Sequence, residues 1–341
     1  MALVAITRRL PDVATDLLRA AGHDVRLHDA DLPPSREELF RLVAGADAVV
    51  SLLSDAVDVE VLDAAGPGLR VVANYAVGLD NVDLDACRSR GVAVAHTPGV
   101  LDEATADLAW TLLLAVARRA LEGHRLVASG RWAGWAPLQL LGTELHGRRF
   151  GVVGLGRIGT AAARRARGFG MEVVYHARSR HERPEAELPA RKVPLDELLA
   201  TSDVVSLHCP LTDATRHLID ARALELMKRS AILVNTARGE VVDEKALVDA
   251  LAEGRIAGAG LDVFEREPRV HPRLPTLQNV VMAPHLGSAT VATRDAMARL
   301  VADAVIGVLA GREPANLALL PGAPRDANDG TDGPDGASSS G

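Results

Sequence analysis

The chain has 341 residues, a formal net charge of −7 at pH 7 and a 48% share of hydrophobic residues. This length is enough for two domains with separate cores. The mildly acidic charge argues against nucleic acid or an anionic membrane as a partner. Two cysteines, Cys87 and Cys209, are too few for a disulfide framework, and no apolar stretch is long enough to span a bilayer. We therefore expect a cytoplasmic protein without a signal peptide.

Strand and helix patterns alternate along the first hundred residues, which predicts a parallel sheet covered by helices on both faces. Amphipathic stretches such as Asp12–Ala21 and Arg36–Ala44 separate the apolar runs. The runs predicted to form strands are Ala2–Thr7, Val25–His28, Ala48–Leu53, Arg70–Ala76 and Val92–Ala95.

A long apolar helical pattern follows, from Leu101 towards His124, and then a loop that contains Trp132 and Trp135. The long amphipathic helix expected over Ser288–Ala310 would return to the first domain and make that domain discontinuous. Between them lies a second alternation of strands and helices. Its predicted strands are Phe150–Val153, Glu172–His176, Val204–His208, Ile232–Thr236, Ala257–Leu261 and Val280–Ala283.

A glycine-rich turn joins the strand Phe150–Val153 to the helical pattern after it. Gly154 permits a tight turn, Gly156 lets the backbone approach a pyrophosphate, and Gly159 lets helix and strand pack closely. The N-terminus of the helix then offers free N–H groups to the anion. A turn without a ligand is the plainer alternative, but the flanking strand and helix favour dinucleotide binding. The predicted cofactor-binding residues here are Gly154, Leu155, Gly156, Arg157, Ile158 and Gly159.

The next strand ends in Ala177, Arg178, Ser179 and Arg180, with no carboxylate at its tip. NAD-binding units carry an acidic residue there, which bonds the adenosine ribose. Its absence removes repulsion against a 2′-phosphate, while arginine and serine supply charge-assisted hydrogen bonds. The pattern therefore favours NADP(H) over NAD(H). The alternative is a solvated basic loop on an enzyme that accepts either cofactor.

Three polar residues, Arg238, Glu267 and His285, follow predicted strands of the second half. Parallel strands end at the same sheet edge, so these side chains are expected to meet where a nicotinamide would lie. An arginine can grip a substrate carboxylate and polarise the carbonyl, a histidine can deliver the proton, and a glutamate can hold the histidine charged. Taken singly, they could equally be a surface ion-pair partner, a charge in an acidic turn and a helix cap. Their joint placement favours hydride transfer to a keto acid.

These observations predict an α/β fold with two doubly wound parallel-sheet domains, a Rossmann coenzyme domain inserted in a flavodoxin-like substrate domain. The substrate domain would take residues 1–99 and 288–321, and the coenzyme domain residues 100–287. Residues 323–341 are rich in Gly, Pro, Asp, Asn and Ser and are predicted to form a disordered tail.

The motifs resemble those of the D-isomer-specific 2-hydroxyacid dehydrogenases, and within them the glyoxylate/hydroxypyruvate reductases. The family's catalytic arginine, glutamate and histidine fall on Arg238, Glu267 and His285, and the resemblance implies no metal. Ala177 stands where many relatives carry aspartate, which matches the NADP-type reductases. The resemblance runs from Ala2 to Leu320 and is carried by Thr97–Leu101, Ala104–Ala109, Gly154–Gly159, Asn235–Gly239, Gly260–Pro268 and Pro284–Thr290.

The resemblance implies further roles. The backbone amides of Val77 and Gly78 would hold the substrate carboxylate, Leu53 would also contact the substrate, and Asp262 would meet the nicotinamide carboxamide. It implies a homodimer built from the helix after Leu101 and the tryptophan loop, in which Trp135 either approaches the partner's active site or only packs. The other implied cofactor-binding residues are Thr105, His208, Cys209, Pro210, Thr236, Ala237, Arg238, His285 and Gly287, and Arg238 and His285 also belong to the substrate-binding set.

The sequence therefore predicts an oxidoreductase that transfers hydride from NADPH to a small 2-keto acid, glyoxylate or hydroxypyruvate, and forms a D-2-hydroxy acid. Leu52, Leu53 and Ser54 make little provision for a phosphate group, which favours a small substrate. The alternatives are a phosphoglycerate, formate or phosphonate dehydrogenase of the same family, and a cofactor-sensing binding protein like the corepressors among the relatives.

Overall fold

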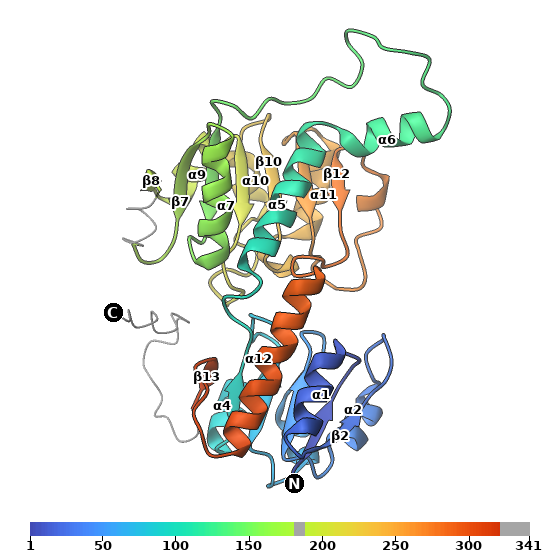
Figure 1. Ribbon diagram of the computed structural model, residues 1–341. Coiled ribbons are helices and arrows are strands. Elements are labelled where there is room, and N and C mark those ends of the chain that lie inside the picture. Colours follow the sequence, from blue (N-terminus) through green and yellow to red (C-terminus); the bar gives the residue numbers. More distant parts are fainter. Residues whose placement is uncertain (181–187, 321–341) are drawn as a thin grey trace, which may run out of the picture. The chain divides into compact units, whose positions relative to one another are not determined.

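Two compact units make up the computed structural model, which describes residues 1–180 and 188–320 (Figure 1). One unit comprises Met1–Val100 with Thr290–Gly341, and the other comprises Leu101–Ala289. The predicted tail, residues 323–341, lies outside the described residues. Over the described part of the chain, no helix combines the length and the apolar character needed to cross a membrane.

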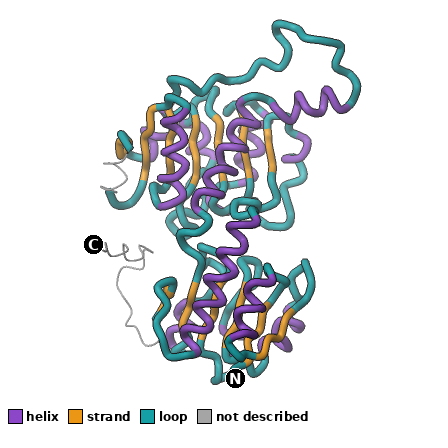
Figure 2. The backbone as a smooth tube through the Cα atoms, in the orientation of Figure 1, coloured by secondary structure: helices purple, strands orange, loops and turns teal. Residues whose placement is uncertain are grey.

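The first unit is built on a six-stranded sheet in the order β13-β5-β4-β3-β1-β2. Its strands pair in parallel except for the edge strand β13, which runs antiparallel to β5. Helices α1 and α12 pack together on one face, and α2, α3 and α4 cover the other (Figure 2). The elements are β1 (Leu3–Ile6), α1 (Asp12–Ala20), β2 (Asp24–Leu27), α2 (Arg36–Val43), β3 (Ala48–Ser51), α3 (Val59–Ala65), β4 (Val71–Asn74), α4 (Leu84–Ser89), β5 (Ala93–Ala95), α12 (Val291–Leu309) and β13 (Leu317–Leu319).

The second unit is built on a seven-stranded parallel sheet in the order β12-β11-β10-β9-β6-β7-β8. The predicted α/β class with two doubly wound sheets is confirmed. The elements are α5 (Asp102–Ala117), α6 (Ala120–Ala128), β6 (Arg149–Val153), α7 (Arg157–Gly168), β7 (Glu172–His176), β8 (Ala190–Lys192), α9 (Leu195–Thr201), β9 (Val204–Leu207), α10 (Ala221–Leu226), β10 (Ile232–Asn235), η1 (Gly239–Val241), α11 (Glu244–Ala252), β11 (Gly258–Leu261), η2 (Leu274–Thr276) and β12 (Val280–Met282).

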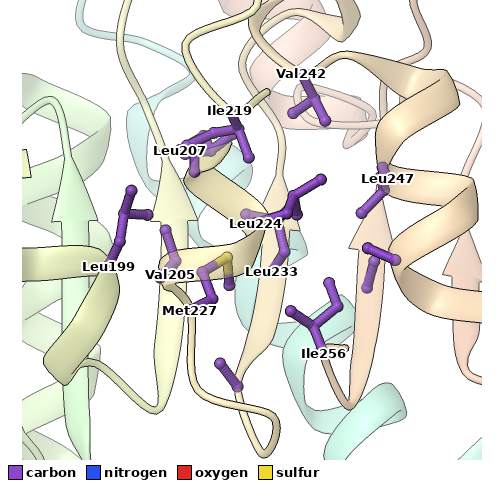
Figure 3. Close-up of a cluster of buried hydrophobic side chains, with 14 of the residues drawn as sticks. Leu199, Val205, Leu207, Ile219, Leu224, Met227, Leu233, Val242, Leu247 and Ile256 are labelled. Carbon is purple, nitrogen blue, oxygen red and sulfur yellow. The ribbon is translucent and has the colours of Figure 1, made fainter. Parts of the chain in front are cut away.

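Both faces of this seven-stranded sheet are buried, because successive residues of a strand point to opposite sides. Val152 packs in a cluster with α5 and α7, whereas its neighbour Val153 packs in a cluster with α9, α10 and α11. Figure 3 shows the second cluster, where Leu207 and Leu233 of the sheet lie against Leu224 of α10. Because helices cover both faces of the sheet, its strands carry apolar side chains on both sides.

The single helix expected from Leu101 towards His124 is wrong, because the chain breaks between α5 and α6. Arg119 adopts a left-handed conformation with φ of 51°, and its guanidinium donates to both carboxylate oxygens of Glu122 at 2.9 and 2.7 Å. No glycine or proline marks this break, so the apolar pattern runs through it unaltered. The following helix, α6, has no buried residue.

Candidate active site

The predicted site residues of the second unit gather at the carboxyl ends of neighbouring strands, the edge where open parallel sheets bind ligands. Thr105 is the exception, since it lies on α5. The glycine turn follows β6, Ala177–Arg180 follows β7, His208–Pro210 follows β9, Thr236–Arg238 follows β10, Asp262 and Glu267 follow β11, and His285 and Gly287 follow β12.

His285 and Glu267 form a hydrogen-bonded pair. The Nδ1 atom of His285 lies 2.9 Å from Oε2 of Glu267, and the other carboxylate oxygen accepts from the backbone N–H of Phe264 at 3.0 Å. Because a carboxylate only accepts, Nδ1 carries the proton and Nε2 is left for exchange with a substrate. Burial raises the pKa of Glu267, but the hydrogen bond and charge of His285 and the charge of Arg238 outweigh it and bring that pKa below its usual value.

Arg238 lies in a turn that a buried asparagine shapes. The side chain of Asn235 accepts from the backbone N–H of Ala237 at 3.0 Å and donates to the carbonyl of Arg238 at 2.9 Å. A Cβ on Gly239 would come within 2.0 Å of the Phe264 carbonyl oxygen, so only glycine lets the two strand-end loops touch. We expected no such role for Asn235 or Gly239, although an asparagine at a strand end is a known turn former.

Asp262 clamps the segment that carries the histidine. Its two carboxylate oxygens accept from the backbone N–H groups of Leu286 at 2.6 Å and Gly287 at 2.8 Å. Its backbone carbonyl oxygen accepts from the backbone N–H of His285 at 2.8 Å. His285 itself has φ of 55°, a left-handed conformation that costs a non-glycine residue about 1–2 kcal/mol. Burial raises the pKa of Asp262 above its usual value, although the two amides and His285 oppose the rise. The sequence did not reveal this clamp.

The glycine turn has the geometry that a dinucleotide needs. Gly154 has φ of 91°, and a Cβ there would come within 2.7 Å of the Cys209 backbone nitrogen. A Cβ on Gly159 would lie 2.0 Å from the carbonyl oxygen of Gly154. A Cβ on Gly156 would meet nothing within 4 Å, so the backbone there is open to a ligand at the N-terminus of α7. These residues therefore fit a pyrophosphate.

Two buried polar atoms just beyond the neighbouring strands β9 and β10 lack a hydrogen-bond partner within the described residues, namely Nδ1 of His208 and Oγ1 of Thr236. Burial lowers the pKa of His208 to about 4, so its ring is neutral at pH 7. Leaving such atoms unsatisfied costs about 1–3 kcal/mol each, which a ligand's polar groups would offset. Thr105 lies beside Gly287, where a Cβ would come 3.4 Å from its hydroxyl oxygen.

The exposed side chains of Arg178, Ser179 and Arg180 follow β7, the strand next to β6. The ammonium group of Lys192, in the neighbouring β8, donates a hydrogen bond to the carbonyl oxygen of Arg178 at 3.1 Å. The tip of this strand is where the adenosine ribose of a dinucleotide lies in this fold. The local charge is therefore positive at that position.

The remaining predicted residues belong to the first unit, where β3 and β4 are neighbours. Leu53 lies in the loop after β3, and Val77 and Gly78 lie in the loop after β4. Among the described residues, the backbone N–H groups of Val77 and Gly78 have no acceptor. Two adjacent free amides form a site that can bind an anion.

The sequence model of the family described as D-isomer specific 2-hydroxyacid dehydrogenase, NAD binding domain, matches residues 110–287. A glyoxylate reductase of Thermococcus onnurineus (strain NA1) is 51% identical over 318 residues, which cover 92% of this chain and 95% of the relative. A solved structure from Thermus thermophilus is 50% identical with a TM-score of 0.88, and the match covers 93% of this chain and 100% of that chain.

Another solved structure is the NADPH-dependent glyoxylate/hydroxypyruvate reductase of Sinorhizobium meliloti in complex with NADP and malonate. It is 33% identical with a TM-score of 0.83, and the match covers 96% of this chain and 99% of that chain. Similarity to these proteins extends over both units of the chain.

We predict that Asp262→Asn lowers the free energy of unfolding by about 1–3 kcal/mol and lowers kcat, because the new amide group presents a donor to a backbone N–H. Urea denaturation and steady-state kinetics measure the two effects. Asp249→Asn is the matched control, since its carboxylate forms ion pairs with Lys245 and Arg273 at the surface, and such pairs contribute about 0–1 kcal/mol. Equal losses in both variants would contradict the clamp.

Proposed function

Since the chain belongs to the D-isomer specific 2-hydroxyacid dehydrogenases, we propose that it reduces glyoxylate or hydroxypyruvate to the D-2-hydroxy acid and prefers NADPH. The observation that carries this proposal is the His285–Glu267 hydrogen bond of 2.9 Å at the carboxyl edge of a dinucleotide-binding sheet. A proton donor with its own carboxylate, close to the charge of Arg238, is what reduction of a carbonyl requires from the protein.

When bound, the nicotinamide supplies the hydride. His285 delivers the proton to the carbonyl oxygen from Nε2, and Glu267 stabilises the charged ring through Nδ1. The guanidinium of Arg238 polarises the carbonyl and pairs with the carboxylate of the keto acid. The free amides of Val77 and Gly78 also bind that carboxylate.

The proposed substrate is small because residues 52–58, the loop after β3, contain no lysine or arginine that could bind a phosphate. Within the described residues, two arginines contact this loop, and both are paired with a carboxylate. Nη2 of Arg8 donates to Oγ of Ser54 at 2.9 Å and pairs with the buried Asp55 at 3.3 Å, and Arg36 pairs with Asp58. A guanidinium that is already paired is a poor phosphate ligand. This arrangement favours glyoxylate and hydroxypyruvate over phosphorylated acids.

We also propose a homodimer and a cytoplasmic location. Helix α6 and the loop after it expose apolar side chains, with exposed fractions of 58% for Val127, 83% for Trp135, 80% for Leu138 and 61% for Leu141. Apolar side chains gathered on one segment are typical of a protein–protein interface. Both cysteines are free, which fits a reducing compartment.

The reaction is tested by initial rates on a panel of 2-keto acids with NADPH and NADH. We predict that His285→Ala lowers kcat by about 10²–10⁴-fold, because the proton donor is lost, and leaves the Kd of NADPH nearly unchanged. His217→Ala is the control, since it removes an exposed histidine that also pairs with a glutamate, Glu265, at 3.1 Å. Wild-type protein that binds NADPH tightly but turns over no 2-keto acid would support a cofactor-sensing protein instead.

The cofactor preference is tested by the double variant Arg178→Ala/Arg180→Ala. We predict that its KM for NADPH rises at least about tenfold, because two charged donors to the 2′-phosphate are lost, while its KM for NADH changes little. Arg191→Ala removes another exposed arginine of this region, which pairs with Glu197, and serves as the control. Equal changes for both cofactors would argue against a 2′-phosphate site.

The dimer is tested by light scattering on the purified protein, whose chain has a mass of 35.9 kDa. We predict twice this mass for the wild type and the mass of one chain for Leu138→Glu/Leu141→Glu, because two charges would be buried unpaired. Leu32→Glu, at a leucine of the first unit that is 77% exposed, should stay dimeric. A monomeric wild type would refute the proposal.

A further inference from the structure

Three consecutive backbone carbonyls, those of residues 76–78, are held from the interior of the first unit. The backbone N–H of Thr97 donates to the first at 2.9 Å, Nδ1 of His96 contacts the second at 2.9 Å, and Nδ2 of Asn74 donates to the third at 2.9 Å. Because a carbonyl only accepts, the proton of the His96 ring lies on Nδ1. Of the three donors, one is a backbone N–H and two are the side chains of His96 and Asn74.

The direction of the carbonyls fixes the direction of the amides. In a planar trans peptide the C=O and the following N–H point in opposite directions, and the peptide bonds after residues 76, 77 and 78 are trans. Holding the three oxygens inward thus turns the N–H groups of Val77, Gly78 and Leu79 away from the interior. Within the described residues, none of these three amides has an acceptor. They form a row that can bind an anion.

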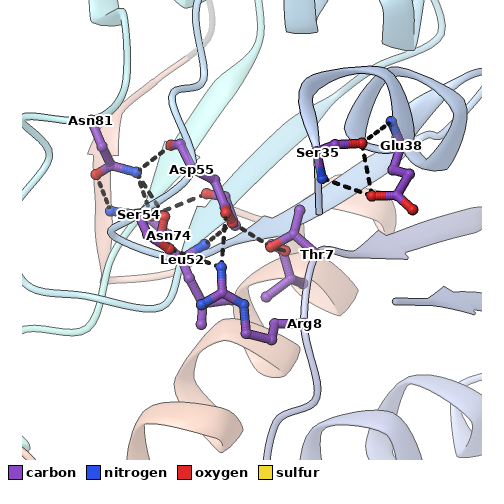
Figure 4. A network of polar contacts seen from close by, with 11 residues as sticks. Thr7, Arg8, Ser35, Glu38, Leu52, Ser54, Asp55, Asn74 and Asn81 are labelled. Atoms are coloured by element: carbon purple, nitrogen blue, oxygen red, sulfur yellow. Dashed lines mark hydrogen bonds and ion pairs between the residues drawn. The ribbon is translucent and has the colours of Figure 1, made fainter. Parts of the chain in front are cut away.

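Asn74 is itself held rigidly. It is fully buried, its Oδ1 accepts from Oγ of Ser51 at 3.0 Å, and its Nδ2 also donates to Oδ1 of Asn81 at 2.9 Å. Figure 4 shows Asn74, the last residue of β4, facing Asn81 of the loop that follows β4. The amide that holds the Gly78 carbonyl therefore has a single position.

Asn81 extends the network to the neighbouring loop. Its Nδ2 donates to the carbonyls of Leu52 at 3.0 Å and Asp55 at 2.9 Å, which flank Leu53 (Figure 4). The carboxylate of Asp55 accepts in turn from the backbone N–H of Leu52 at 2.8 Å. One carboxamide thus links the loop after β3 to the loop that carries the free amides.

We infer that His96 and Asn74 are positioning residues for the substrate carboxylate. Asn81 holds the loop that contains Leu53 in a fixed position relative to Asn74. This inference rests on the proposed function, because it takes the amides of Val77 and Gly78 as the carboxylate site. In this role the three side chains act by holding backbone oxygens, so that the amides are aimed before the substrate arrives and binding requires little reorganisation.

His96 is the residue to test, since it is partly exposed and its replacement perturbs the core less than that of Asn74. His96→Leu removes the donor to the Val77 carbonyl. We expect the KM for glyoxylate to rise about tenfold while kcat at saturation and the KM for NADPH stay within about threefold, because a carboxylate contact made equally in ground and transition states affects only KM.

His96→Asn is the rescue variant. Its Nδ2 is separated from Cα by the same number of bonds as Nδ1 of histidine, so it can donate to the same carbonyl. We expect a KM for glyoxylate near the wild-type value, with thermal melting of all three proteins showing that each is folded. Equal KM values in His96→Leu and the wild type would overturn the inference, and so would equal loss in both variants.

A measurement that needs no turnover separates this inference from the proposed function. Oxamate, a 2-oxo acid analogue that accepts no hydride, is titrated into ¹⁵N-labelled protein with NADPH present. We expect the backbone amide signals of Val77 and Gly78 to shift in the wild type and in His96→Asn, but much less in His96→Leu. Shifts without turnover would refute the proposed reaction alone, and unchanged signals in the wild type would refute the carboxylate site.

Discussion

The hydrogen bond between His285 and Glu267 is useful only if the backbone holds both residues in place. His285 occupies a left-handed conformation, which is unfavourable for a residue with a side chain. Three hydrogen bonds to Asp262 offset that cost and fix the segment, while the Phe264 amide orients the glutamate. Proton transfer requires a short, well-defined distance between donor and acceptor. The chemistry of this site therefore depends on a backbone conformation that buried side chains hold in place.

The same solution recurs at other strand ends. Asn235 shapes the turn of Arg238, as Asp262 shapes that of His285 and Asn74 that of Gly78. Each is a short polar side chain at or just beyond the last residue of a buried strand, where the backbone leaves the ladder and its polar groups need partners. Such side chains satisfy these groups and give the loop one conformation. Hydrogen bonds from these three side chains therefore restrict the loops that carry the site residues.

Sequence patterns predicted this fold well because they report burial. Valine-rich runs such as Glu172–His176 become strands with the predicted bounds, and the turn after Phe150–Val153 joins a strand to a helix as glycine spacing indicates. Features without an apolar or glycine signal escaped prediction. The break at Arg119 interrupts a continuous pattern, and the antiparallel β13 is only three residues long. The clamp of Asp262 depends on amides that lie 24 and 25 residues away and carry no sequence signal.

Two carboxylates in one loop have pKa values displaced in opposite directions. The pKa of Glu267 lies below its usual value, so its support of the charged His285 ring is fully present above the ordinary pKa of a glutamate and is lost only as pH falls through the lowered value. The pKa of Asp262 lies above its usual value, so on acidification this group takes up a proton at a higher pH than an ordinary aspartate does. A protonated carboxyl has one oxygen that must donate, which sets it against the amides of Leu286 and Gly287. Acid therefore acts on this site in two ways: protonation of Asp262 loosens the turn that holds the histidine, and protonation of Glu267 neutralises the histidine's partner.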